Sequence, residues 1–139
     1  MHCLTDYDVK LLVAFNEALK CKKKFIDIFI QNGFPELAAL ANAINSDVEA
    51  LHWLLNNGYP EFAVLSNAID GEENAIKWLE KYNLTFLSTF AAACRQETEA
   101  IKWFADRDLR VFIMIIATIH VILRFQSWDS SDWHRRRRE

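Results

Sequence analysis

The chain has 139 residues, an apolar fraction of 52% and a formal net charge of −3. Length and apolar content are those of one ordinary folded domain, and the small negative charge favours no polyanionic partner, so nucleic acid is not expected as a ligand. Only three Gly and two Pro occur, which argues against a turn-rich sandwich or barrel and favours helices joined by short loops.

The N-terminal segment and the cysteines indicate an intracellular protein. MHCLTDYDVK carries acidic residues where a secretory signal has a basic start and an apolar run. Cys3, Cys21 and Cys94 form neither a Cys-x-x-Cys pair nor another zinc-site spacing. We therefore expect reduced thiols in the cytoplasm, with no metal and no cofactor.

A periodicity of 25 residues runs through nearly the whole chain. The clearest copies begin at 32, 57 and 82 and read NGFPELAALANAINSDVEALHWLLN, NGYPEFAVLSNAIDGEENAIKWLEK and YNLTFLSTFAAACRQETEAIKWFAD. They align without a gap, and the same register gives less regular units from 7 and 107. Internal repetition of this kind is typical of solenoid proteins.

The aligned columns predict where helices begin and end. The second column holds residue types that tolerate the left-handed conformation at a helix end. Its members are Asp8, Gly33, Gly58, Asn83 and Asp108. Pro35 and Pro60 follow two residues later, where the first turn of a helix accepts proline. A polar break then divides each unit, so we expect two helices per unit.

Apolar columns three and four residues apart give the first helix of each unit one buried stripe. The columns are Leu12, Leu37, Phe62, Leu87 and Phe112; Phe15, Leu40, Leu65, Phe90 and Ile115; and Leu19, Ile44, Ile69, Cys94 and Ile119. One hairpin does not bury this face alone, but a stack of hairpins does.

We therefore predict an all-α solenoid of about five helix-turn-helix repeats. It forms a single domain over 1–128, with units starting near 7, 32, 57, 82 and 107. The alternative is a compact helical bundle in which the periodicity is accidental.

Parts of two units resemble a known family. NAIDGEENAIKWLEKYN and AACRQETEAIKWFADRD resemble the helix-turn-helix part of ankyrin repeats, and HWLLNNG, from His52 to Gly58, resembles the end of the second ankyrin helix. The resemblance covers Leu37 to Asp106. Ankyrin units have about 33 residues, so each unit here lacks about eight, where that family places its β-turn finger. The resemblance implies a protein-binding scaffold without an active site.

Trp53, Trp78 and Trp103 occupy one column at the edge of the buried stripe, and Trp128 continues it. In a structural interpretation the rings seal neighbouring second helices, since a tryptophan buries roughly 150–250 Å². In a functional interpretation they form an aromatic stripe that grips a peptide or helix, because tryptophan is a favoured hot-spot residue.

Polar positions supply the remaining candidate partner-binding residues. Asn42 and Asn67 repeat opposite the stripe, and Glu72 and Glu73 lie in an acidic turn. The first turn, KCKKK from Lys20, is basic instead, so charge is polarised along the stack. Solvated turns and specific acidic-partner or phosphate sites both account for these charges.

The segment 111–123, VFIMIIATIHVIL, lacks the polar turn of the other units. A membrane span needs about 20 residues, so we expect a buried helix. Terminal repeats usually have a polar outer face, so an apolar one here predicts a homodimer or partner docking. The residues concerned are Phe112, Ile115, Ile116 and Ile119. A membrane-associated protein held by this helix is the alternative function, although a membrane is not the favoured partner.

The polar tail 129–139 includes four arginines, Arg135 to Arg138, and is expected to be disordered. No column combines a nucleophile with a base, so we expect no catalytic residues. The sequence thus predicts a non-catalytic protein-protein interaction scaffold of ankyrin-like type, with a protein partner that the sequence does not identify.

Overall fold

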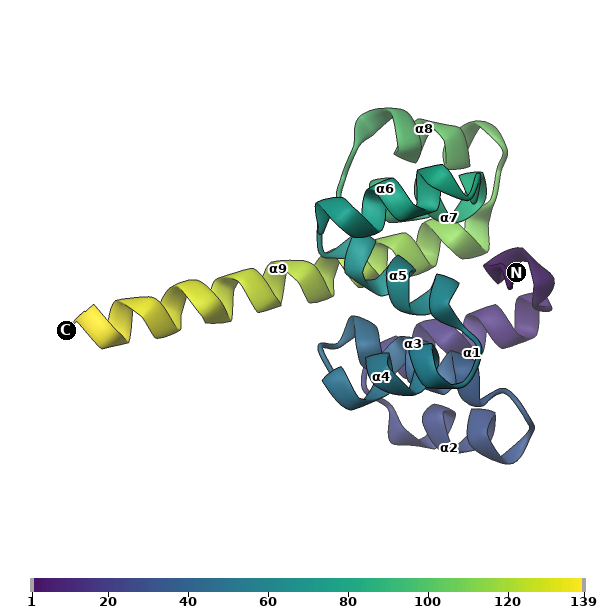
Figure 1. The fold of residues 1–139 in the computed structure, drawn as a ribbon, viewed down its shortest axis with the longest axis horizontal. Helices are drawn as coiled ribbons and strands as arrows, with labels where there is room; N and C mark the ends of the chain where they lie inside the picture. The colour runs from purple at the N-terminus through teal and green to yellow at the C-terminus, as the bar shows by residue number, and fades with distance from the viewer. Residues whose placement is uncertain (1, 139) are drawn as a thin grey trace.

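The computed structural model describes the backbone of residues 2–138 and the side chains of residues 2–126, and this part of the chain contains helices and no strand (Figure 1). The helices are η1 (Leu4–Asp6), α1 (Val9–Leu19), α2 (Lys23–Gln31), α3 (Pro35–Ile44), α4 (Val48–Asn56), α5 (Pro60–Ile69), α6 (Glu73–Lys81), α7 (Thr85–Cys94), α8 (Thr98–Asp106) and α9 (Arg110–Arg138). The expected all-α class is confirmed for the described residues. Trp128 and the tail 129–139 lie outside the described side chains.

Helix starts recur every 25 residues. α3, α5, α7 and α9 begin at 35, 60, 85 and 110, and α2, α4, α6 and α8 begin at 23, 48, 73 and 98. Pro35 and Pro60 occupy the first position of their helices, where the absence of an N–H removes no intrahelical bond. The last unit has no polar turn, and α9 accordingly continues as one helix that extends beyond the others in Figure 1.

The predicted helix stops are confirmed at four of the five positions. Gly33, Gly58, Asn83 and Asp108 have φ between 53° and 88°, and the next residue donates its backbone N–H to the helix that has just ended. Tyr59 N, for example, donates to Leu54 O at 2.9 Å. This is the bond of a Schellman motif.

The fifth position, Asp8, differs because it lies between the short 3-10 helix η1 and α1 and starts the second of them. Its φ is −62°, and it is the N-cap of α1.

A second set of left-handed residues lies between the two helices of each unit. Cys21, Ser46, Gly71 and Gln96 have φ values of 64°, 75°, 87° and 69°. Three of them are not glycine, so their residue types did not reveal this turn. The backbone N–H of Asp47 donates to Asn42 O at 3.0 Å, which shows that this helix end also closes on itself.

The odd-numbered helices carry the core. They pack in the order α1, α3, α5 and α7, and each even-numbered helix packs against the odd helices before and after it. α3 buries eight of its 10 residues, whereas α4 buries two of 9, Ala50 and Leu54. The inner helices are therefore surrounded by protein, and the outer helices present most of their surface to solvent.

Side-chain hydrogen bonds join the C-terminal ends of the inner helices. Asn45 Nδ2 donates to Leu19 O at 3.0 Å, and Arg95 Nη1 donates to Ala68 O at 2.6 Å. In both cases the donor lies one unit after the acceptor, so these bonds tie neighbouring units together. Ala68 O also accepts the backbone N–H of Gly71, and Arg95 adds a side-chain donor to it.

Asp70 occupies the position equivalent to Asn45 and Arg95 in the unit between theirs. It cannot make the same bond when ionised, because a carboxylate has no proton to donate. Gln126 Nε2 of α9 donates to Ile44 O at 3.3 Å instead.

The last helix also contacts the first. α9 packs against α7 and α8, and it packs against α1 as well. The residues proposed for self-association, Phe112, Ile115, Ile116 and Ile119, are between 0% and 6% exposed. They belong to the core of a single chain, rather than to an open face, because α9 is covered on two sides.

The two kinds of turn respond differently to substitution. Gly58 has φ 88°, and no atom lies within 4 Å of the point that a Cβ would occupy, so Gly58→Ala should lower the free energy of unfolding by about 1 kcal/mol through backbone strain alone. Gln96→Gly should raise it by about 0.5 kcal/mol, because glycine relieves the strain but loses more chain entropy. Urea unfolding measures both. A loss of stability in the Gln96→Gly variant would contradict the left-handed turn.

Asp70 gives stability a pH dependence. Asp70 is exposed at the surface, but desolvation by neighbouring groups and the Glu72 carboxylate raise its pKa above the usual value. A raised folded pKa means that ionisation of Asp70 opposes folding at neutral pH, and that this penalty disappears as the pH falls below the ordinary carboxyl range. Asp70→Asn should therefore raise the melting temperature at neutral pH and lose this advantage below about pH 4. The exposed N-cap variant Asp8→Asn is the control, and equal pH dependence in both variants would contradict the assignment.

Candidate interaction surfaces

The three described tryptophans are half-buried and pack against the core. The Trp53 ring lies nearly parallel to that of Tyr59, with centroids 6.1 Å apart, and the Trp78 ring lies 4.5 Å from that of Tyr82. The guanidinium of Arg107 lies 4.0 Å from the Trp103 ring centroid, a cation–π contact. Each tryptophan thus has a structural role and retains an accessible edge, so the two interpretations of the column are compatible.

Two predicted partner-binding residues meet at one pocket. Asn42 of α3 and Trp53 of α4 line a cavity of about 350 Å³ between α2, α3 and α4. Ala38 and Ala39 are also among its lining residues, and their small side chains leave the space that a larger residue would fill. The pocket is therefore a direct result of the small residues in the first helix of this unit.

Asn67 lies at a separate, smaller pocket. This cavity of about 200 Å³ lies between the end of α3, the start of α4 and the end of α5, and Ser66 and Asp70 also line it. Its walls include Asp47, whose carboxylate Oδ1 accepts hydrogen bonds from the backbone N–H groups of Glu49 and Ala50. The structure thus places the two asparagines in different pockets of neighbouring units.

The acidic turn residues Glu72 and Glu73 are exposed at the N-cap and first position of α6. Negative charge at a helix N-terminus is favourable, because it interacts with the unpaired N–H groups and the helix dipole. Their positions therefore have a structural explanation that does not require a partner.

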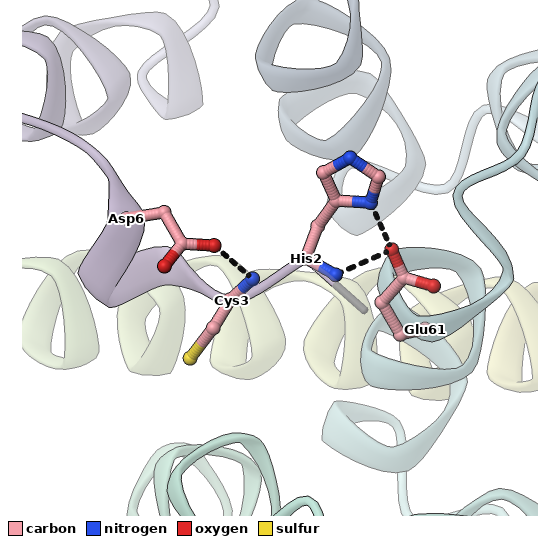
Figure 2. Close-up of polar contacts among 4 residues, drawn as sticks. All are labelled: His2, Cys3, Asp6 and Glu61. Atoms are coloured by element: carbon pink, nitrogen blue, oxygen red, sulfur yellow. Dashed lines mark hydrogen bonds and ion pairs between the residues drawn. The ribbon is translucent and has the colours of Figure 1, made fainter.

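A polar cluster at the N-terminus, built around one buried carboxylate, was not found from the sequence (Figure 2). Glu61 is 2% exposed, and its Oε1 accepts the backbone N–H of His2 at 3.2 Å and lies 2.8 Å from Nδ1 of the same histidine. Asp6 accepts the backbone N–H of Cys3 at 3.0 Å. Leu4 between them is fully buried. These contacts fix the N-terminal segment on α5.

A second buried carboxylate, Glu36, lies at the corresponding position of α3 and is 6% exposed. Burial and the Glu36 carboxylate raise the pKa of the Tyr7 hydroxyl, and burial and the same carboxylate raise the pKa of Tyr59. Both phenols therefore stay protonated at neutral pH. Glu36 Oε1 has no partner among the described residues. Pro35 and Pro60 predicted the helix starts, but nothing in the sequence indicated that the glutamates that follow them would be buried.

The described residues offer limited reactive chemistry. Among them, no group of three or more His, Cys, Asp or Glu side chains is arranged to hold a metal ion. Cys94 is fully buried, and burial raises the pKa of its thiol, which makes it a poor nucleophile. Within the same residues no helix combines the length and apolar character needed to cross a membrane.

Comparisons with known proteins give no relative. No family model matches the chain, and neither the curated proteins nor the solved structures provide a match. The resemblance to ankyrin repeats therefore depends on the residues quoted from the sequence.

The contact between His2 and Glu61 should be measurable as stability. His2→Ala removes a partner of a carboxylate that is 2% exposed, and a buried acceptor without its partner costs about 1–3 kcal/mol. We expect the free energy of unfolding to fall by about 1 kcal/mol, since half of the His2 side chain is exposed and water replaces part of the interaction. Thr5→Ala, exposed in the same segment, is the control. No difference between the two variants would contradict the role of His2.

Proposed function

We propose that this chain is a non-catalytic protein-protein interaction scaffold, built as an ankyrin-like solenoid of about five 25-residue helical repeats and acting in the cytoplasm. The regular helix starts and the stacking of the odd-numbered helices support this architecture. Such a stack presents a rigid surface on which neighbouring units contribute side chains to one partner.

The observation that carries the proposal is the pocket shared by Asn42 and Trp53. Its volume of about 350 Å³ suits one or two side chains of a partner. A half-exposed tryptophan supplies a large apolar contact at low entropic cost, and the neighbouring asparagine both donates and accepts hydrogen bonds. Apolar walls with a few polar groups are the usual composition of a recognition pocket.

Ala39 permits a test that fills this pocket from the edge of the core. It lines the cavity, and the chain itself carries Met114 at the equivalent position of the last unit. Selection from a random-peptide display library against the intact chain should enrich peptides whose binding to Ala39→Met is at least about tenfold weaker. Thr89→Met, at the same position of another unit, should bind them as the unmodified chain does.

Two outcomes would overturn the proposed site. One is the absence of any enriched peptide, and the other is equal binding by the unmodified chain and Ala39→Met. Circular dichroism of both methionine variants shows whether a loss of binding comes from unfolding instead.

A further inference from the structure

The N-terminus of α2 breaks a rule that the other outer helices follow. Lys22 is its N-cap, and Lys23 and Lys24 form its first turn. The corresponding N-cap residues of α4, α6 and α8 are Asp47, Glu72 and Glu97. Positive charge at a helix N-terminus opposes the helix dipole and is unfavourable there. Violations of local rules are expected where a residue serves function rather than stability.

The neighbouring carboxylates neutralise this basic turn only in part. Glu17 lies 2.5 Å from Lys22 Nζ and 3.6 Å from Lys20 Nζ, and the hydrogen bond from Lys22 lowers the pKa of Glu17. Asp27 lies one helical turn after Lys23, on α2. Lys20 to Lys24 contain four lysines, so the turn remains positive after both carboxylates are counted.

A pocket opens beside this turn. It has a volume of about 510 Å³ and lies between the C-terminal ends of α1 and α3 and the outer part of α9. Leu19, Val121, Ile122 and Phe125 give it apolar walls, and Lys20 and Cys21 place the basic turn at its rim. Phe125 is 65% exposed and Val121 is 47% exposed, so much of this apolar surface is in contact with solvent.

The polar side chains of the pocket are already used within the chain. Asn45 Nδ2 donates to Leu19 O, Gln126 Nε2 donates to Ile44 O, and Thr118 Oγ1 donates to Met114 O. A ligand therefore gains mainly from apolar contact inside the pocket and from positive charge outside it.

We propose that this pocket and the adjacent lysines bind an acidic segment of a partner protein. One large apolar side chain of the segment enters the pocket, and the flanking carboxylates lie against Lys22 to Lys24 and the N-terminus of α2, where both the ammonium groups and the backbone N–H groups attract anions. The inference rests on the proposed function as a protein-binding module but uses a different face. A concave site between three helices admits a side chain, whereas a flat lipid surface does not enter it.

The test uses the intact chain and three blocked, fluorescent peptides. The first has a phenylalanine between two pairs of glutamates, the second has alanine in place of phenylalanine, and the third has lysines in place of glutamates. We expect saturable binding of the first, at least about tenfold weaker binding of the other two, and weaker binding of the first at high salt.

The double variant Lys23→Glu with Lys24→Glu separates binding from stability. It should weaken binding of the first peptide at least about tenfold, and it should raise the melting temperature by about 1–4 °C because the new charges suit the helix N-terminus. Lys77→Glu with Lys102→Glu makes the same charge change at exposed positions elsewhere and should leave binding unchanged. Ala39→Met should also bind the first peptide normally.

Three results would overturn the inference. The first is no saturable binding of the acidic phenylalanine peptide, and the second is equal loss in the two double-lysine variants. The third is binding to vesicles that contain anionic lipid, lost in the Lys23→Glu with Lys24→Glu variant, in a chain that binds none of the peptides. If library peptides still depend on Ala39 in any of these cases, the proposed function stands and only this site fails.

Discussion

The structure depends on one constraint: the inner helices bury their apolar faces only by packing against neighbouring helices of the stack. α3 is covered by α1, α5 and its outer neighbours, and the same holds along the chain to α9. Phe15, Phe62 and Phe90 on three of these helices are fully buried, which no single hairpin of this length achieves. Because α9 also packs against α1, the first and last units protect each other's apolar faces, and neither needs a polar outer surface there.

Much of the helical pattern was readable from the sequence, because it follows from local chemistry. Pro35 and Pro60 start helices, and Gly33 and Gly58 end them, since proline fixes φ and glycine accepts positive φ. Long-range features were not readable in this way. The left-handed conformation of Gln96 comes from the geometry of the turn, because glutamine itself does not favour positive φ. Likewise, nothing in the sequence of residues 111–123 indicates contact with α1.

The candidate sites likewise combine local features that the sequence shows with long-range contacts that only the fold reveals. The sequence identified Asn42 and Trp53 as separate columns, and only the packing of α3 on α4 brings them to one pocket. The burial of Glu61 follows from contact with the N-terminal segment, which the repeat alignment does not contain. The basic turn was visible as a charge pattern, but its relation to the pocket on α9 required the fold. The basic turn therefore distinguishes the first unit from its acidic neighbours, and the packing of α9 places a pocket beside that turn.

Native-state hydrogen exchange tests the contact between the first and last units most directly. Ile119 of α9 is fully buried. Ile119→Ala should lower the free energy of unfolding of the cooperative unit that contains it by about 2–5 kcal/mol. If α1 and α9 form one cooperative unit, the substitution lowers the exchange protection of backbone amides in α1 as much as in α9. Loss of protection in α9 alone, with α1 unchanged, would show that the first and last helices do not support each other and would contradict this account of the fold.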